Sequence, residues 1–308
     1  MLRVKRVLCP VDFSPASYRA LDHALLFTKW FQAGLHVLYV QHGTHLPPDR
    51  PGGRKPLVSE VSDYLPRLQV RLTKFAEPAL RVSRSDLPVE LEVVEGDVVE
   101  EILDKVLVLP ADLVVLGTHG HGGLHRLTLG SVAEKVLRRV TCPVLAVPPS
   151  AVEEVPEPLL FRTVVCAVDF SEASRGALRY AVELAREADA HLVVAHVLEG
   201  LPTDDAPLPP SDLGWVPDAS ARLKALEKLR AFVTHDRRDV EVSREDVVLT
   251  GKAWRALAAF ARQREARLLV VGVHGHVPIG ELVFGSTAHH LVREGPCPVL
   301  TIRPMGTG

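Results

Sequence analysis

Residues 111–131 read ADLVVLGTHGHGGLHRLTLGS, an apolar run followed by a loop rich in glycine and histidine that closes in Gly-Ser. A second stretch, GVHGHVPIGELVFGS at 272–286, again has glycine at its first, fourth and fourteenth places and again ends in serine. A short apolar run predicts a buried strand, and serine is a common residue at the start of a helix. Both stretches therefore predict a strand, a glycine-containing loop and a helix.

The two stretches belong to a duplication of nearly the whole chain. VLCPVDFSPAS at 7–17 and VVCAVDFSEAS at 164–174 share eight of eleven residues at an offset of 157, and the glycine motifs align at an offset of 155. The segment between the copies is rich in proline and glutamate and has no sustained periodicity, which is typical of a linker. We therefore predict one domain at 1–149, a linker at 150–160 and a second domain at 161–308.

Within each copy, predicted strands alternate with predicted helices. The first helix follows Ser14-Pro15, an N-cap residue followed by proline at the first helical position, and Gly34 is expected to cap its C-terminus. Short apolar strands joined by helices indicate a parallel sheet covered on both faces. The fold class is therefore α/β, with two tandem doubly wound (Rossmann-like) domains of five parallel strands each. In the first copy the expected strands are 4–11, 35–40, 89–94, 112–117 and 144–147, and the expected helices include 97–108 and 131–140.

Composition narrows the class of protein. The chain has 308 residues, 47% hydrophobic and 24% charged, which is typical of globular proteins and is long enough for two domains. A formal net charge of -2 offers no basic stripe for nucleic acid. No apolar run is long enough to span a membrane, and the first residues lack the pattern of a signal peptide, so we expect a cytoplasmic protein. The four cysteines lack CxxC spacing and are expected to be buried thiols.

The glycine motif points to an anionic ligand. In an open parallel sheet, ligands bind beyond the carboxyl ends of the strands, where both motifs begin. Glycines there are expected to adopt positive φ and to bring the backbone close to a ligand, and a helix that starts at Ser131 presents unpaired N–H groups. Phosphate fits this site. The motif is neither GxxxxGK[ST] nor a GxGxxG after the first strand, so it is a different phosphate loop.

The pattern Gly117-x2-Gly120-x9-Gly130-Ser131, repeated from Gly272, resembles the ATP-binding signature of the universal stress protein family. PVDFS and AVDFS after the first strand and CPVL before the last strand extend the resemblance over both copies. It implies that Val11 and Asp12 contact the adenosine and that Val40 binds adenine through its backbone. Along the ribose and phosphates it implies contacts from Gly117, Gly120, His121, Gly130, Ser131 and Val132. In the second copy it implies that the ligand contacts come from Val168, Asp169, Val197, Gly272, Gly275, Gly285, Ser286 and Thr287.

The resemblance also implies partners. ATP, accompanied by a divalent cation such as Mg²⁺, is the expected cofactor. The two repeats are expected to form an internal pseudo-dimer through their last strands, and pairing of whole chains into a homodimer is possible. The expected role is that of a nucleotide-dependent sensor or regulator in the stress response. The sequence offers no obvious catalytic base, so ATP hydrolysis is expected to be slow at most.

Several other interpretations stay open at this stage. Ser131 with Glu134 has the spacing of a capping box, which would form without a ligand, and Asp12 is also compatible with a role as a helix cap alone. The His-x-His pairs at 119–121 and 274–276 are compatible with zinc, although neither has an evident third ligand. A nucleotide-free interaction module whose loop histidines bind zinc is therefore the alternative function. A serine hydrolase is disfavoured because the G-x-S-x-G elbow is missing.

The two motifs differ inside the loop, and this predicts unequal sites. Arg126 in the first copy aligns with Glu281 in the second, and Gly122-Gly123 aligns with Val277-Pro278. A guanidinium attracts a triphosphate and a carboxylate repels it. We therefore predict that the first copy binds ATP more tightly.

Overall fold

The computed structural model describes residues 4–42, 64–83, 87–119, 129–149, 162–199, 219–234, 242–273 and 284–303. These residues form two compact units, the first within Arg3–Pro149 and the second within Ser150–Gly308. The predicted linker at 150–160 lies outside the described residues.

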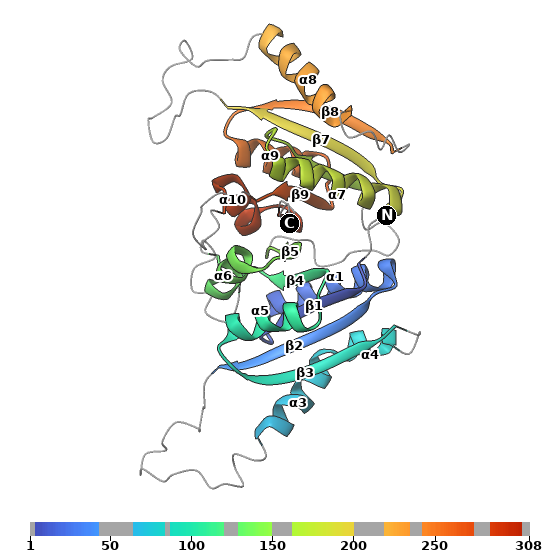
Figure 1. Ribbon diagram of the computed structural model, residues 1–308, viewed down its shortest axis with the longest axis vertical. Helices are drawn as coiled ribbons and strands as arrows, with labels where there is room; N and C mark the ends of the chain where they lie inside the picture. Colours follow the sequence, from blue (N-terminus) through green and yellow to red (C-terminus); the bar gives the residue numbers. More distant parts are fainter. Residues whose placement is uncertain are drawn as a thin grey trace. The chain divides into compact units, whose positions relative to one another are not determined.

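The first unit alternates strands and helices as the sequence predicts (Figure 1). Its predicted strands and helices are all present, with ends that move by up to two residues. The stretch before the third strand is helical in two segments, α3 and α4. The strands are β1 (Arg6–Val11), β2 (Gly34–His42), β3 (Val89–Gly96), β4 (Leu113–Gly117) and β5 (Val144–Val147), and the helices are α1 (Pro15–Phe31), α3 (Tyr64–Phe75), α4 (Glu77–Ser83), α5 (Val98–Val108) and α6 (Ser131–Arg139).

The second unit repeats this order. Its helix α8 corresponds to α3, α9 to α5 and α10 to α6, so the duplication seen in the sequence is also a duplication of structure. The strands are β6 (Thr163–Ala167), β7 (His191–Leu198), β8 (Arg244–Thr250), β9 (Leu268–Gly272) and β10 (Val299–Ile302), and the helices are α7 (Glu172–Ala188), α8 (Ala219–Thr234), α9 (Ala253–Gln263) and α10 (Ser286–Glu294).

Each unit contains five parallel strands in a doubly wound order. The order is β3-β2-β1-β4-β5 in the first unit and β8-β7-β6-β9-β10 in the second. The pairs β1–β2, β1–β4, β2–β3 and β4–β5 are all parallel, as are their counterparts. In each unit the chain starts in the central strand, builds outward and then returns to the other side. The predicted fold class is therefore confirmed.

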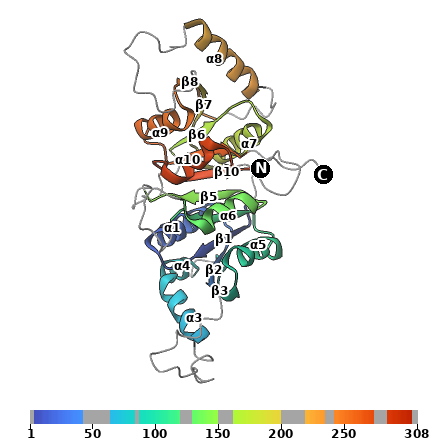
Figure 2. The same cartoon turned by 90° about the vertical axis from the view of Figure 1, so that its left-hand side faces the viewer.

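Helices cover both faces of the sheet. In the first unit α1 and α4 lie on one side of the strands and α5 lies on the other (Figure 2). The apolar spacing of α1 puts Ala20, Ala24 and Phe27 against the sheet, where each is at most 1% exposed. The central strands are equally buried, as expected for a sheet covered on both faces.

Three of the four cysteines are buried, as the sequence predicts, and one is not. The cysteines are free, and Cys9, Cys166 and Cys297 are buried whereas Cys142 is partly exposed. Burial raises the pKa of the Cys9 thiol, with a smaller contribution from the charge of Asp22, and burial also raises the pKa of Cys166. These thiols therefore pack as small apolar groups.

The ends of α1 confirm one prediction and correct another. Ser14 is the N-cap, because its side chain accepts a hydrogen bond from the Ser17 N–H, and Pro15 begins the helix. Gly34 is not the C-cap. The left-handed residue at that end is Gln32, with φ 52° and ψ 43°, and Gly34 already donates its N–H to Lys5 as the first residue of β2. Gln32 takes this conformation while its side-chain amide donates to the Lys29 carbonyl at 2.7 Å.

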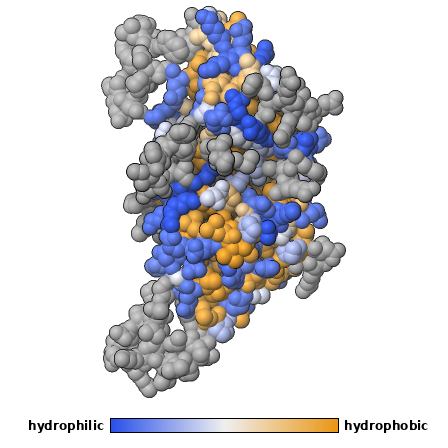
Figure 3. Space-filling view, viewed as in Figure 1, coloured by the Kyte–Doolittle hydropathy of each residue, from blue (hydrophilic) through white to orange (hydrophobic). Residues whose placement is uncertain are grey.

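Polar and apolar residues both reach the surface (Figure 3). Leu107 and Val108 at the end of α5 are 67% and 74% exposed. Isolated exposed apolar side chains are common on folded proteins and need no ligand to explain them. Within the described ranges, no helix combines the length and the apolar character required to cross a membrane.

Candidate functional site

Three of the predicted site residues of the first unit lie where neighbouring strands end. Asp12 follows β1, Val40 lies near the end of β2 and Gly117 ends β4. Because β1, β2 and β4 are parallel neighbours, their carboxyl ends share an edge. Residues that are more than 100 positions apart in the sequence are thereby brought to one place.

The loop after β1 is held by hydrogen bonds to its own side chains. An Asp12 carboxylate oxygen accepts the Ser14 N–H at 2.9 Å, and the Asp12 N–H donates to the Ser17 hydroxyl at 3.3 Å. Asp12 therefore does not cap α1; it orients the residue that does. Phe13, between these two residues, has φ 64°, a left-handed conformation that is rare for an aromatic residue. Such strain is often found at functional sites.

Gly117 is required by packing and not by an unusual backbone conformation. A Cβ at Gly117 would stand 2.8 Å from the Ala16 carbonyl oxygen at the start of α1. We expected positive φ at the motif glycines, and this expectation is wrong for those in the described residues, where the only glycine with positive φ is Gly251. The missing side chain lets β4 end directly against the backbone of α1.

Gly130 and Ser131 form the start of α6. Gly130 is the N-cap, with φ -60°, and has no side chain to bond the first turn of the helix. Ser131 is the first helical residue and is exposed. The capping box is not formed, because Glu134 turns its carboxylate to Arg138 at 2.9 Å and Ser131 lies inside the helix. The helix therefore begins with backbone N–H groups that no serine cap occupies.

The position of Val40 in the sheet allows a ligand to contact its backbone. Val11 and Val40 are only 7% and 8% exposed, so their side chains offer little surface to a ligand. The register of β1 on β2 ends with Val11 opposite Tyr39, so Val40 is the first residue of β2 beyond the end of β1. Its backbone lies at the rim where β1 stops. Val132, in the first turn of α6, is partly exposed.

The second unit places its residues in the same way. Asp169 accepts the Ser171 N–H at 3.0 Å, and Phe170 has φ 67°. A Cβ at Gly272 would stand 2.6 Å from the Ala173 carbonyl oxygen. Gly285 is the N-cap of α10, with Ser286 and Thr287 in its first turn.

Hydrogen bonds at this edge distinguish the two units. In the first unit the Gly130 N–H donates to the Thr118 carbonyl at 2.8 Å, and the Thr118 hydroxyl donates to the Val147 carbonyl at 3.4 Å. The second unit has Val273, which has no hydroxyl, in place of Thr118. A Cβ at Gly285 would meet no atom of the described residues within 4 Å. On the base side of the second unit, His196 Nδ1 lies 2.8 Å from the Val168 carbonyl oxygen.

Some predicted residues lie outside the described residues. These are Gly120, His121 and Gly275, together with the loop residues on which the predicted difference in affinity rests. Of the His-x-His pairs, only His119 is described, and its Nδ1 lies 2.9 Å from Thr118 Oγ1. No group of three potential metal ligands occurs among the described residues.

An aromatic cluster beside the site was not predicted from the sequence. The rings of Phe13 and Tyr39 stack at 4.4 Å, Phe75 packs edge-on to Phe13, and Arg71 lies 4.2 Å from the centre of the Phe13 ring. The signal was present, because the second unit repeats the cluster at a constant offset of 157 residues. There Phe170 contacts His196 and Phe232, with Lys228 Nζ 4.0 Å from the Phe170 ring.

The N-cap residues of α5 and α9, the helices that follow the third strand of each unit, have opposite charges. Asp97 caps α5, and hydrogen bonds from the N–H groups of Glu100 and Val99 hold the pKa of its carboxyl below the usual value. The N-cap of α9 is Lys252, and Glu199 accepts the next N–H, that of Ala253, at 2.7 Å. Each unit therefore supplies a carboxylate to this helix start, but from different elements.

Comparison with known proteins gives the same organisation. The model of the universal stress protein family matches residues 3–148 and 160–303, so it matches each unit once. A universal stress protein of Methanocaldococcus jannaschii is 33% identical over 144 residues, which are 46% of this chain and 81% of that protein. One of Mycobacterium tuberculosis is 32% identical over 193 residues, 63% of this chain and 62% of that protein.

A solved structure supports the fold. The crystal structure of a universal stress protein from Archaeoglobus fulgidus matches with a TM-score of 0.69 and 21% identity, covering 99% of this chain and all of that one. At this identity the likeness concerns the fold alone.

Proposed function

Because the chain belongs to the universal stress protein family, we propose that each unit binds an adenine nucleotide, ATP with Mg²⁺, at the carboxyl ends of its strands. The observation that carries the proposal is the start of α6 and of α10. Each helix begins behind a glycine that has no capping side chain. Uncapped N–H groups and the positive end of the helix dipole favour phosphate.

The loop after β1 supports the nucleoside part of the proposal. The Asp12 carboxylate is held by the Ser14 N–H, so its orientation is set before a ligand arrives. A carboxylate in this position can accept a hydrogen bond from a ribose hydroxyl. Adenine would then lie against the backbone of Val40, beyond the end of β1. In the second unit Asp169 and Val197 would take these roles, with Val168 beside them.

The biochemical role we propose is a nucleotide-dependent sensor or regulator in the stress response. Turnover of ATP is expected to be slow at most, because the resemblance assigns binding roles to these residues and the sequence offers no evident base to activate water. The alternative is a nucleotide-free module whose loop histidines hold zinc.

Mass spectrometry of small molecules released from the purified protein tests the proposal. We expect an adenine nucleotide, and added ATP with Mg²⁺ should bind in calorimetry. Stoichiometric zinc without nucleotide, together with no heat on titration of ATP, would support the alternative. A Ser131→Ala, Ser286→Ala double variant serves as the matched test, because both serines are first helical residues and their loss should weaken ATP binding without unfolding either unit.

We further propose that the two units pair through their last strands as an internal pseudo-dimer, and that whole chains can form a homodimer. Each sheet, taken by itself, ends in a short apolar strand, β5 or β10. Apolar edge strands favour pairing with another strand. Cross-linking of cysteines introduced into β5 and β10 would test the pseudo-dimer, and sedimentation would report the mass of the assembly.

A further inference from the structure

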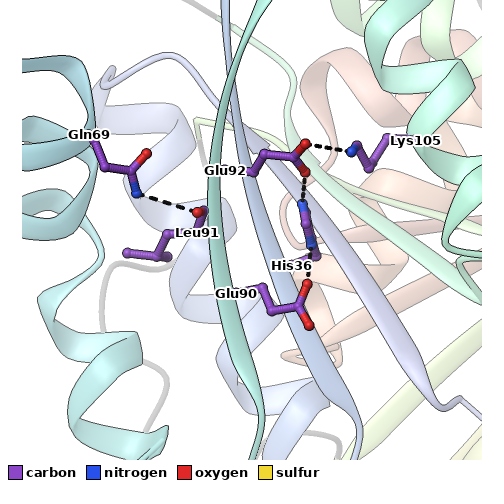
Figure 4. A network of polar contacts seen from close by, with 6 residues as sticks. All are labelled: His36, Gln69, Glu90, Leu91, Glu92 and Lys105. Carbon is purple, nitrogen blue, oxygen red and sulfur yellow. Dashed lines mark hydrogen bonds and ion pairs between the residues drawn. The ribbon is translucent and has the colours of Figure 1, made fainter. Parts of the chain in front are cut away.

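His36 sits in the middle of a charged network on one face of the first sheet (Figure 4). It belongs to β2, in register with Glu90 of the edge strand β3. Its side chain is only 11% exposed. A histidine this far from water is sensitive to the groups that hold it.

Both ring nitrogens of His36 face carboxylates. Nδ1 lies 3.2 Å from Glu90 Oε2, and Nε2 lies 2.6 Å from Glu92 Oε2. A neutral imidazole has one N–H and can donate to only one of these oxygens, whereas an imidazolium can donate to both. We propose that His36 acts as a pH-dependent clamp: its imidazolium ties β3 to β2, and loss of the proton at alkaline pH loosens this edge of the first unit.

The groups around His36 balance its charge. Lys105 of α5 approaches the other oxygen of Glu92, with Nζ 2.7 Å from Oε1. On the β1 side the register partner is Leu8, which carries no charge. Two carboxylates thus face two cations while the imidazole is protonated, and deprotonation leaves one uncompensated negative charge.

The other charged residues of α5 lie elsewhere. The Glu101 side chain approaches Gly96 at the far end of β3, and Asp104 is exposed. Helix α3, which packs on β3, contributes the amide of Gln69 to the Leu91 carbonyl. A single metal ion does not explain the network, because the two carboxylates lie at opposite nitrogens of the ring.

The clamp also requires that Glu92 is ionised. Burial raises the pKa of Glu92, but hydrogen bonds from Lys105 and His36 outweigh it and hold the pKa below the usual value. Glu92 therefore stays ionised in the range in which histidine becomes charged. The complete network exists only while both ring nitrogens of His36 carry a proton, since each then donates to its own carboxylate.

The second unit lacks the clamp and provides an internal control. Val193 takes the place of His36, opposite Glu245 of β8. Glu245 pairs with Arg264 at 2.7 Å, and a half-exposed His191 lies 3.7 Å away. Arginine keeps its charge at every pH that a protein tolerates, so Glu245 keeps a charged partner when His191 is neutral. The pairing of β7 and β8 should therefore depend on pH less than that of β2 and β3.

Hydrogen exchange followed by mass spectrometry at pH 6 and pH 9 tests the clamp in the full-length protein. Protection factors, corrected for the faster intrinsic exchange at alkaline pH, should fall about fivefold over β3 (Val89–Gly96). They should change little over β8 (Arg244–Thr250). An equal fall in both strands, or none in β3, would overturn the proposal.

Two variants separate the clamp from a general loss of stability. His36→Val copies the residue of the second unit and should abolish the pH dependence in β3. Glu90→Gln replaces a carboxylate that is 71% exposed, and its amide can accept from the charged ring or donate to the neutral one, so the pH step should shrink. A full step in both variants would show that His36 is not its origin. Ring nitrogen shifts in NMR at pH 6 should show two protonated nitrogens, and a single tautomer there would contradict the clamp.

Discussion

The first and second units share a backbone plan and differ in the side chains that secure it. Both place a left-handed phenylalanine after the first strand, pack the glycine that ends the fourth strand on the first helix, and begin the last helix behind an uncapped glycine. In the first unit the Thr118 hydroxyl donates to the Val147 carbonyl at 3.4 Å, whereas Val273 has no hydroxyl at this place in the second unit. The features that recur serve the fold and the proposed phosphate site, and the features that differ are where the two proposed sites can be told apart.

The largest expected difference concerns nucleotide affinity. Gly130→Glu adds a carboxylate at the start of α6 and should weaken the tighter ATP site about a hundredfold, since charge repulsion opposes phosphate at a helix N-terminus. Gly285→Glu should remove only the weaker site and leave the tight binding phase intact. Calorimetric titration of ATP into both variants measures this, with circular dichroism as the check on folding. Equal losses from the two changes would remove the predicted asymmetry.

The asymmetry has two separate origins. In the sequence, the first copy has Arg126 where the second has Glu281, and this charge difference predicts unequal affinity. Neither residue is among those that the structure describes. The structure adds the hydrogen bond from the Gly130 N–H to the Thr118 carbonyl, which holds the start of α6 in place before a ligand binds. Preorganisation reduces the entropy lost on binding. Thr118→Val keeps this backbone bond and removes only the Thr118 hydroxyl, which donates to the Val147 carbonyl at 3.4 Å. If the backbone bond is the origin of the asymmetry, the two affinities should stay apart in this variant.

The next effect concerns stability. Gly272→Ala and Gly117→Ala would each push a Cβ against a carbonyl oxygen, at 2.6 Å from Ala173 and 2.8 Å from Ala16. Overpacking of this kind costs about 1–3 kcal/mol, and the closer contact should cost more. Urea unfolding compares the two variants, with Gly285→Ala as the control because its Cβ would meet no atom of the described residues within 4 Å. If Gly285→Ala is as destabilising as the others, close packing is not the reason for these glycines.

For these glycines, the sequence predicted the secondary structure but not the tertiary contacts. The spacing of the motif placed Gly117 at the end of a strand and Ser131 at the start of a helix, and both are confirmed. The motif could not show that Gly117 contacts Ala16, because that contact depends on how α1 packs against β4. The same limit hid the His36 network, whose partners are more than fifty residues away in the sequence.

For α1, the sequence predicted the start of the helix correctly but not its end. Ser14-Pro15 predicted the beginning of α1, because capping there involves residues within one turn. Its end fell at Gln32 and not at Gly34, because Gly34 is already in the ladder of β2. Fold class was predictable from alternating apolar runs, whereas pairings across the sheet required coordinates.

A smaller effect is expected at the first helix caps. Ser14 accepts the Ser17 N–H and is 3% exposed, whereas Ser171, which caps α7 in the same way, is partly exposed. Ser14→Ala should cost about 1–2 kcal/mol, near the upper end for a cap, because water cannot replace the lost acceptor. Ser171→Ala should cost about 1 kcal/mol or less. Urea unfolding of the two variants measures the difference, and an equal cost would show that burial of the cap is unimportant.

The smallest expected effect is a loss of stability in acid that depends on β3 of the first unit and has no counterpart at β8 of the second. Because the pKa of Glu92 lies below its unfolded value, its ion pair stabilises the first unit above that unfolded value, and the contribution is lost as the pH falls through the lowered pKa. The second unit has Val247 at the aligned position and should show no such loss. Glu92→Gln should therefore destabilise the protein by about 1 kcal/mol or less at pH 7, since the group is partly exposed, and by nothing near pH 2. Urea unfolding at both values measures the difference. A cost that persisted in acid would mean that Glu92 acts through packing and not through its charge.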